Sequence, residues 1–389
     1  MITPNFWHGK RVFVTGHTGF KGSWLSLWLQ LLGSEVLGFS LQPPTQPNLF
    51  DLAQVNQGMQ SVTGDIRNLE FLKQIMSDFQ PEIVIHMAAQ PLVRRSYAFP
   101  LETLSTNVIG TANVMEAIRY TDSVRAVVDI TSDKCYENRE WVWGYREDDR
   151  LGGYDPYSSS KACAELVVAT YRNSFFNPSD YLNHGVAIAT TRAGNVIGGG
   201  DWAEDRLVPD ILKSILRREP AHIRNPYATR PWQHVLEPLN GYLMLAERLY
   251  NDGIAFADSW NFGPDQANVE TVGWIADRLY SLWGEGLYWE KDSASTHVHE
   301  NTYLKLDCSK AKAKLDWHPK LDLDATLSWI VEWTKAFQAG VDMRQFTESQ
   351  INRFMVYGLS AASQGSTLNF ARSNSNSSIA ISDPVLLYE

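Results

Sequence analysis

Cysteine, long apolar runs and positive charge are all scarce in this sequence, and each shortage excludes a class of protein. The three cysteines, Cys135, Cys163 and Cys308, are scattered without a CxxC pair, so we expect neither a disulfide framework nor a metal site. No apolar run is long enough to cross a bilayer, and the first residues do not have the order of a signal peptide. We therefore expect a reduced, cytoplasmic protein with no membrane contact.

The charge balance argues against one further class. Formal net charge is −10, from 34 lysines and arginines against 44 aspartates and glutamates. Nucleic-acid binding depends on neutralising phosphates, so no nucleic-acid partner is expected. An anionic small molecule stays compatible, because a few arginines in one cleft can dominate locally. The 389 residues, 44% of them hydrophobic, suffice for one large core or two joined cores.

A regular alternation of strand and helix patterns fills the first half of the chain. Strand-like runs fall at 11–16, 35–40, 82–89, 125–132 and 186–198, and helical patterns lie between them at 23–33, 69–79, 103–120 and 157–175. This alternation indicates βαβ units, so the predicted fold is α/β, a doubly wound parallel sheet of the Rossmann type. Ligands of such folds bind at the carboxyl ends of the strands.

The pattern changes near Gly198, where a loop and longer helical patterns begin. We predict a dinucleotide-binding domain over 1–192, with segments near 231–265 returning to it. A smaller α/β lobe over 193–355 would bind the substrate. The last residues, 356–389, are rich in serine and asparagine and aperiodic, which is typical of a loosely ordered tail.

The stretch VFVTGHTGFKGSW has glycines at a strand–turn–helix junction. Glycine lets the backbone turn tightly and approach a pyrophosphate, and the following helix N-terminus offers N–H groups and a positive dipole end. The strand and helix context favours a dinucleotide loop over a glycine-rich turn without a ligand. The expected cofactor contacts are Gly16, His17, Thr18, Gly19, Phe20, Lys21 and Gly22.

One part of the dinucleotide pattern is missing. An acidic residue about 20 positions after the glycines usually holds the ribose hydroxyls. The corresponding region, GFSLQPPTQ, has Ser40 and no acid, and no arginine that would accept a 2′-phosphate. The choice between NAD and NADP therefore stays open from these residues, although Lys21 could compensate electrostatically.

Tyr157 and Lys161 lie four residues apart at a predicted helix start, so they share one helix face. A lysine ammonium beside a phenol favours the phenolate and lowers its pKa. Such a tyrosine can act as a general base toward an alcohol. The pair occurs often by chance, but much less often beside a dinucleotide loop.

The motifs TGHTGFKG, GDI, HMAAQ, NVIGT, TSDKCYE, YSSSK and GNVIGGG occur in this order over roughly residues 8 to 335. In this respect the chain resembles the extended short-chain dehydrogenase/reductases. More narrowly, GHTGFKGSWL, TSDKCYEN, NVIGGGDWAEDRLVPD and RPWQHVLEPL resemble the nucleotide-sugar 4,6-dehydratases, most of all those that act on CDP-glucose. The resemblance implies bound NAD, C4 oxidation of the sugar, loss of water across C5 and C6, and return of the hydride to C6.

The resemblance also assigns roles to a short segment. Ser132 would hydrogen-bond the reacting hydroxyl, Tyr157 would take its proton, and Lys161 would hold the nicotinamide ribose. Asp133 would protonate the departing C6 hydroxyl if burial raises its pKa. Relatives that act on dTDP-glucose have a glutamate as the C5 base where this chain has Lys134. Lys134 is then either a neutral base or a stabiliser of the enolate; a surface ion pair of Asp133 is the plain alternative.

The remaining predicted contacts also come from the resemblance. Asp65 and Ile66 would touch the adenine, Ala88, Ala89 and Gln90 would line the cofactor, and Asn107 would support that loop. Alternatively, Asp65 caps the next helix and Asn107 is a buried, backbone-paired asparagine. Substrate contacts are expected from Arg95, Ser132, Asn195, Arg206, Arg230 and His234, with Arg94 near the sugar. His234 could equally be a packed core histidine.

The sequence also bears on the oligomeric state, on metal binding and on alternative functions. The helices over 103–120 and 158–173 pair across a homodimer in this superfamily, so a homodimer is expected. His297 and His299 stand two apart, which suits an exposed strand or loop better than a metal site. The alternatives are an NAD-dependent nucleotide-sugar 4-epimerase and a non-catalytic dinucleotide-binding protein. An epimerase has no use for the acid/base pair Asp133 and Lys134. A non-catalytic protein has no use for Tyr157 and Lys161.

Overall fold

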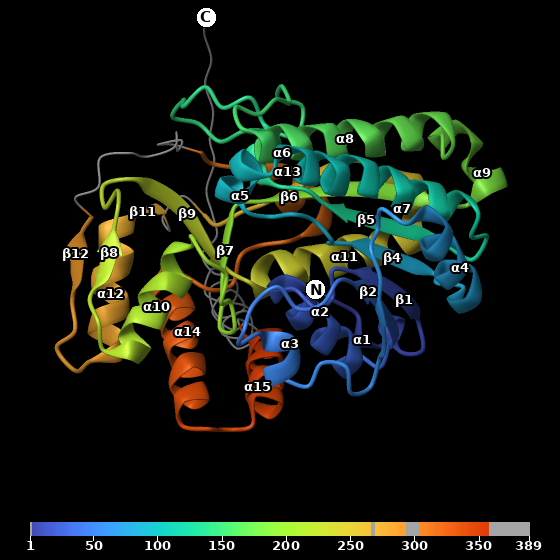
Figure 1. Cartoon of the computed structure of the whole chain (residues 1–389). Helices are drawn as coiled ribbons and strands as arrows, with labels where there is room; N and C mark the ends of the chain where they lie inside the picture. Colours follow the sequence, from blue (N-terminus) through green and yellow to red (C-terminus); the bar gives the residue numbers. More distant parts are fainter. Residues whose placement is uncertain (1, 266–268, 293–303, 358–389) are drawn as a thin grey trace, which may run out of the picture.

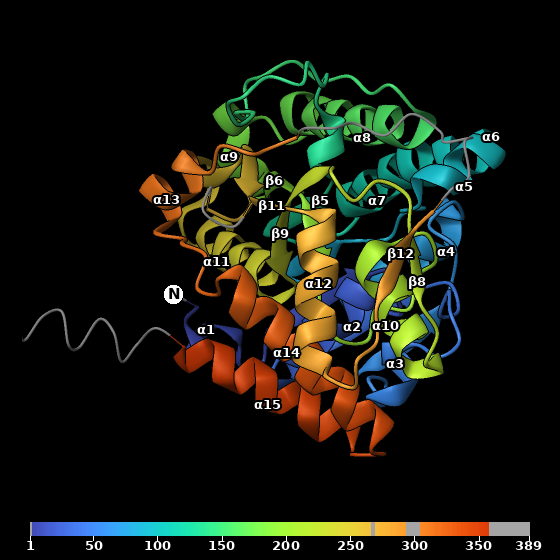
Figure 2. The same cartoon turned by 90° about the vertical axis from the view of Figure 1, so that its left-hand side faces the viewer.

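The computed structural model describes residues 2–265, 269–292 and 304–357 (Figures 1 and 2). The predictions for His297, His299 and the tail beyond Tyr357 lie outside these ranges. Within them, no helix is long and apolar enough to span a membrane.

A seven-stranded sheet forms the centre of the larger lobe, in the order β10-β6-β5-β4-β1-β2-β3. Its strands are β1 (Arg11–Thr15), β2 (Glu35–Ser40), β3 (Gln60–Thr63), β4 (Ile83–His86), β5 (Ala126–Ile130), β6 (Ala187–Ala193) and β10 (Ser259–Phe262). Every neighbouring pair is parallel. The predicted doubly wound parallel sheet is confirmed. The sequence pattern missed β3 because this edge strand is short, polar and largely exposed.

Helices cover both faces of this sheet (Figure 1). On one face lie α2 (Phe20–Leu31) and α11 (Leu236–Asp252); on the other lie α4 (Leu69–Phe79), α7 (Gly110–Arg119) and α8 (Pro156–Ser174). Side chains of β1 alternate between the two cores: Val12 and Val14 join the first, and Phe13 joins the second. Burial on both faces explains why the strands are nearly continuous apolar runs.

The predicted strand over 186–198 is two strands in two different sheets. β6 ends at Ala193, and β7 (Asn195–Ile197) pairs instead with β9 (Thr229–His234), which also pairs with β11 (Val269–Thr271). Gly194 separates them, and a Cβ there would lie 3.2 Å from the Asp133 carboxylate. The chain therefore crosses from the large sheet to the smaller lobe beside the TSDK segment.

The smaller lobe has its own hydrophobic core. It contains α10 (Leu207–Arg217), β8 (Ala221–Ile223), α12 (Val272–Trp283), β12 (Trp289–Lys291) and α14 (Leu323–Gln338). The segment after β9 returns to the large lobe, where α11 packs on the sheet and β10 extends it. α15 (Met343–Val356) also packs on α2, so the C-terminal helices join the two cores.

The predicted helix over 103–120 contains a π-helical turn. α6 (Pro100–Leu104) continues through the π turn Ser105–Ile109 into α7. π turns insert one extra residue per turn and occur often at functional sites. Here the turn contains Asn107. The other short helices are α1 (Pro4–Trp7), α3 (Leu49–Leu52), α5 (Val93–Ala98), α9 (Tyr181–His184) and α13 (Ser309–Leu315).

Candidate active site

The glycine loop forms a cradle that excludes larger side chains. Gly16 has a φ of +77°, and a Cβ there would lie 2.7 Å from the Ala88 backbone nitrogen. A Cβ on Gly22 would lie 2.1 Å from the Gly16 carbonyl oxygen. The loop ends at Gly19, the N-cap of α2, which has no side chain to cover the helix N-terminus. These features fit a pyrophosphate held by backbone N–H groups.

The loop after β4 faces this cradle and is held by Asn107. The Asn107 amide donates to the Gln90 carbonyl oxygen at 3.1 Å and accepts the Gln90 N–H at 2.8 Å. It also donates to the Ser160 hydroxyl on α8 at 2.8 Å. Asn107 thus ties the residues 88–90 to the helix that carries Tyr157 and Lys161.

The ends of β2 and β3 differ from the usual ribose site. Ser40 exchanges a hydrogen bond of 2.8 Å with Thr18. The His17 ring is fully buried against Gly38 and bonds the Ser61 hydroxyl at 2.7 Å; its burial lowers its pKa to about 4. Asp65 pairs with Arg67, whereas Asn68 caps α4, so the capping alternative for Asp65 is wrong.

Lys21 turns away from the ribose end of the cradle. Its amine lies 3.5 Å from the Tyr242 phenol on α11, on the same side as Asp133 and Lys161. Desolvation, together with the charges of Lys161 and Arg206, lowers the pKa of Lys21 to about 7. Lys21 therefore does not replace the missing acidic ribose ligand, and it adds a cation near the chemistry instead.

The tyrosine and lysine lie on the first turns of α8, as their spacing predicts. Asp155 caps this helix, and the Tyr157 N–H donates to the Ser96 hydroxyl at 3.1 Å. The Lys161 amine donates to the Ile130 carbonyl oxygen at the end of β5, at 3.0 Å. Both side chains are more than nine-tenths buried.

The phenol does not have a lowered pKa in this structure. Burial raises the pKa of Tyr157 to about 12, opposed by a hydrogen bond with Ser132 and by the charge of Arg206. The expectation of a phenol that loses its proton near neutrality beside Lys161 is therefore not met in this structure. The Ser132 contact does place the reacting pair of hydroxyls together.

The TSDK segment follows β5 as a single 3₁₀ turn. The Ser132 hydroxyl donates to Asp133 at 3.0 Å and accepts the Lys134 N–H at 3.2 Å. Asp133 is 6% exposed, and desolvation raises its pKa against the opposing effects of Lys134, Ser132 and Arg230. A buried carboxyl with a raised pKa is suited to donate a proton.

Lys134 lines a separate cavity, unlike its two neighbours Ser132 and Asp133. It lines a cavity of about 390 Å³ together with Tyr136, Glu137, Asn138, Arg150, Leu151, Gly152, Gly153, Tyr154 and Ser158. Tyr157 is not among the residues that line this cavity. The charge of Lys134 opposes the rise in the pKa of Asp133 that desolvation causes.

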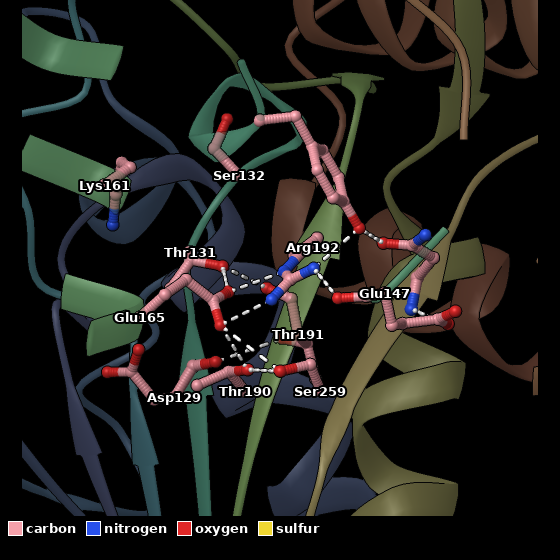
Figure 3. Close-up of polar contacts among 12 residues, drawn as sticks. Asp129, Thr131, Ser132, Glu147, Lys161, Glu165, Thr190, Thr191, Arg192 and Ser259 are labelled. Carbon is pink, nitrogen blue, oxygen red and sulfur yellow. Dashed lines mark hydrogen bonds and ion pairs between the residues drawn. The ribbon is translucent and has the colours of Figure 1, made fainter. Parts of the chain in front are cut away.

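A buried ion pair that the sequence analysis missed lies behind this segment (Figure 3). Arg192 on β6 donates to both carboxylate oxygens of Glu165 at 2.9 Å, and both side chains are about 3% exposed. Thr131 and Thr190 also donate to Glu165. Glu165 follows Tyr157 and Lys161 at the same spacing of four, which was the available signal.

The same pair extends to the far side of the TSDK segment. Arg192 donates to the Tyr136 phenol at 2.7 Å and to the Glu147 carbonyl oxygen at 2.9 Å, and Tyr136 donates to Asn261 at 2.8 Å. The helix with Tyr157 and the turn with Asp133 are therefore fixed to one common support. A charge-assisted, desolvated network of this kind restrains geometry strongly.

Cationic side chains from the smaller lobe border the site. Arg206 pairs with Asp201 at 2.9 Å, and Asp205 lies 3.1 Å from Arg94 and 3.8 Å from Arg224. The charge of Arg230 on β9 opposes the rise in the pKa of Asp133 that desolvation causes. Asn195 is the first residue of β7 and follows Gly194.

Two predicted substrate contacts lie elsewhere. Arg95 pairs with Glu102 at 3.1 Å and stacks on Phe99, whereas its neighbour Arg94 crosses to Asp205. His234 is fully buried between Trp24 and Trp329, which supports its alternative role as a packed histidine, but its Nε2 has no hydrogen-bond partner among the described residues, so it is not a fully satisfied one. Nothing in the residue spacing distinguishes Arg94 from Arg95, because only the direction of each side chain separates them.

The family model described as GDP-mannose 4,6 dehydratase matches residues 13–329. The CDP-glucose 4,6-dehydratase of Salmonella typhimurium is 57% identical over 355 residues, covering 91% of this chain and 99% of that protein. A dTDP-glucose 4,6-dehydratase of Xanthomonas campestris is 24% identical over 341 residues, covering 82% of this chain and 92% of that protein.

Solved structures share the fold. The dTDP-glucose 4,6-dehydratase of Streptomyces venezuelae with NAD has a TM-score of 0.72 at 22% identity, covering 85% of this chain and 98% of that one. The UDP-glucose 4-epimerase of Thermus thermophilus with NAD also has a TM-score of 0.72 at 22% identity, covering 84% and 99%. Dehydratases and epimerases therefore share this architecture, and the fold alone does not separate them.

Proposed function

Because the chain belongs to the GDP-mannose 4,6-dehydratase family, we propose that it is an NAD-dependent hydro-lyase that converts CDP-glucose to CDP-4-keto-6-deoxyglucose and water. Its similarity to the Salmonella typhimurium enzyme, at 57% identity over almost the whole chain, supports the cytidine nucleotide. The observation that carries the chemistry is the buried Asp133 beside Ser132 and Tyr157. A 4-epimerase has no need of an acid there.

The cofactor would occupy the glycine cradle. Gly16, Gly19 and Gly22 would approach its pyrophosphate, and the loop held by Asn107 would line its other side. Bound there, the nicotinamide would supply a hydride acceptor for C4 in its oxidised form and a hydride donor for C6 in its reduced form. The structural neighbours that carry NAD support this choice over NADP.

The protein side chains supply the proton movements. Tyr157 takes the proton of the sugar O4 hydroxyl, which Ser132 orients by a hydrogen bond. Since burial alone raises the pKa of Tyr157 to about 12, the phenolate depends on nearby cations, of which Arg206 already acts on it. Asp133 donates its proton to the departing C6 hydroxyl. Lys134 either removes the C5 proton or stabilises the enolate.

The smaller lobe would bind the nucleotide diphosphate. Arg206 and Arg230 are the proposed phosphate ligands, with Asn195 beside them, because the planar guanidinium pairs with two phosphate oxygens at once. Their present partners include Asp201, which an anionic substrate would displace or join. Arg94 is a better candidate than Arg95 for the sugar edge, because it crosses to the smaller lobe.

We also propose a homodimer in the cytoplasm. α6, the π turn Ser105–Ile109 and α7 each pack on α8 along one side of the large lobe. Apolar side chains are exposed on α6 at Leu101, in the π turn at Ile109 and on α8 at Leu166. Contiguous exposed apolar residues commonly mark a protein interface.

Intramolecular hydride migration tests the reaction. CDP-glucose deuterated at C4 should give a product with the label at C6, measured by NMR. Label kept at C4 would identify an epimerase, and label lost to solvent would contradict both. Absence of turnover with CDP-, dTDP-, UDP- and GDP-sugars in parallel would leave only a dinucleotide-binding role, and their relative rates define the base.

A further inference from the structure

Asp129 is a buried carboxyl group that the proposed reaction does not use. It lies on β5, three residues before Ser132, and it is 1% exposed. Among the described residues, neither of its carboxyl oxygens has a hydrogen-bond partner. Burial without such partners is costly for an ionised carboxylate, so its surroundings must compensate or it must be protonated.

The nearest basic group, His86 on β4, does not supply the compensating charge. Its Nε2 lies 3.7 Å from Asp129 Oδ1, which is too far for a hydrogen bond. Thr15 accepts the N–H groups of Met87 and Ala88, so its hydroxyl donates to His86 Nδ1 at 2.6 Å. Burial lowers the pKa of His86 to about 3, so the ring is neutral.

Arg192 is also unavailable, because it is bound to Glu165. Both nitrogens of its fork lie 2.9 Å from that carboxylate, which also accepts from Thr131 and Thr190. Arg192 is therefore paired already, whereas the Glu165 carboxylate still acts on Lys161 and Asp129. Among the described residues, the Asp129 carboxylate and the Lys161 ammonium then remain here. The Lys21 amine beside Tyr242 and the buried Cys135 thiol are the other titratable groups that interact with Lys161.

The positions of these two groups fit one another. Lys161 donates to the carbonyl oxygen of Ile130, the residue that follows Asp129. In Figure 3 its amine points toward the side on which Glu165 and Asp129 lie. Desolvation lowers the pKa of Lys161, and the charges of Asp129 and then Glu165 act against that shift. Reciprocally, desolvation raises the pKa of Asp129 to about 7, and Lys161 acts against it while Glu165 adds to it.

We propose that Asp129 is a positioning residue that keeps Lys161 in its ammonium form by acting as its buried counter-ion. The proposal rests on the proposed function, with Lys161 taken as one of the cations on which the Tyr157 phenolate depends. In a low-dielectric interior a lone lysine loses its proton readily, and a nearby carboxylate opposes that loss. A lysine without a charge would no longer support the Tyr157 phenolate, so Asp129 acts on the reaction through Lys161.

Competitive labelling of the full-length protein as purified tests the proposal without cofactor or substrate. Trace acetic anhydride acetylates only unprotonated amines, and mass spectrometry of the Lys161 peptide follows its reactivity against pH. We expect the labelling midpoint of Lys161 to fall by at least one pH unit in Asp129→Asn, which means about tenfold higher reactivity below both midpoints. Asp129→Ser, which also removes the charge, should give the same direction.

A second buried carboxyl provides the matched control. Glu237 on α11 is fully buried and has an oxygen without a partner among the described residues, but its contacts are Lys320 and Leu321. Glu237→Gln should leave the Lys161 midpoint unchanged. A midpoint that stays or rises in both Asp129 variants, or that falls equally in Glu237→Gln, overturns the proposal. Because no turnover is needed, this result is separate from success or failure with CDP-glucose.

In the working enzyme the same change has a second expected readout. The alkaline limb of the kcat profile contains the proton loss of Lys161 as well as that of Asp133, and the Lys161 component should move to lower pH in Asp129→Asn. A purely structural role would lower kcat at every pH without moving the limb.

Discussion

Two ion pairs beside the site differ in how they expose their charges, one behind the large sheet and one facing the smaller lobe. At the edge of the large sheet, Glu165 and Arg192 are about 3% exposed and bound to each other and to neighbouring hydroxyls. On the side of the smaller lobe, Arg94 and Asp205 form a pair whose side chains are 37% and 43% exposed. One arrangement fixes geometry, and the other leaves charges that a ligand can reach.

This difference follows from the energetics of ion pairs. A buried pair has no water to replace a lost partner, so its geometry is held tightly. An exposed pair contributes little stability and exchanges partners easily. We therefore assign proton transfer to the residues at the carboxyl ends of the parallel strands, and recognition of the anionic nucleotide to the smaller lobe.

The largest expected effect is on turnover, from a change at Tyr157, which lies near the carboxyl ends of the parallel strands. Tyr157→Phe removes the proposed general base and should lower kcat by about 10²- to 10⁴-fold, without a large change in binding. Steady-state turnover of CDP-glucose measures it. Tyr171→Phe is the matched control, because it removes a phenol of the same helix that bonds Glu116 away from the site. Equal losses in both variants would contradict the assignment.

A second test compares two ion pairs of equal length. Arg192–Glu165 and Arg353–Glu332 both have N–O distances of 2.9 Å, but the second pair is about half exposed. Arg192→Met leaves a buried carboxylate unpaired and should lower the free energy of unfolding by about 3–5 kcal/mol. Arg353→Met should lower it by about 1 kcal/mol or less. Urea unfolding measures both, and similar losses would remove the distinction between buried and exposed pairs.

A third test uses pH, at the junction of the two cores. Burial raises the pKa of Glu237 to about 7, so the folded protein holds this proton where the unfolded chain has lost it. The free energy of unfolding should therefore fall as pH rises from about 4.5 to 7, by up to about 3 kcal/mol from this group, and level off above. In Glu237→Gln this pH-dependent component is absent. The free energy of unfolding of the variant should therefore rise relative to that of the wild type as pH increases across that range. A difference that does not change with pH would refute this account.

The sequence predicts the larger lobe well for a physical reason. Parallel strands buried on both faces must be apolar runs, and the crossover helices between them must be amphipathic, so both leave periodic patterns. The glycines around Gly16 and the spacing of Tyr157 and Lys161 are equally local signals. The exposed edge strand β3 leaves no such pattern, and it was missed.

The smaller lobe depends on information that is not local. The change of sheet at Gly194 is invisible in a run of β-forming residues, because pairing partners are chosen by distant strands. The directions of Arg94 and Arg95 are set by Asp205 and Glu102, and His234 is enclosed by aromatic rings from two other helices. Residue type indicated a role in each case, but only packing decides which side chain reaches the site.

The smallest expected effect comes from Arg230, a residue of the smaller lobe whose charge acts on Asp133 of the large lobe. Arg230 in the smaller lobe lowers the pKa of Asp133, while desolvation raises it. Arg230→Met should raise KM for CDP-glucose about 10- to 100-fold, as expected for a charged hydrogen bond to a phosphate. Because Asp133 must be protonated to expel the hydroxyl, losing this cation should also move the alkaline limb of kcat to higher pH, opposite to the shift in Asp129→Asn. Arg230→Lys keeps the charge and should restore the limb but not KM, since the planar fork is lost. A limb that does not move in Arg230→Met would mean that the smaller lobe binds the substrate without tuning the acid.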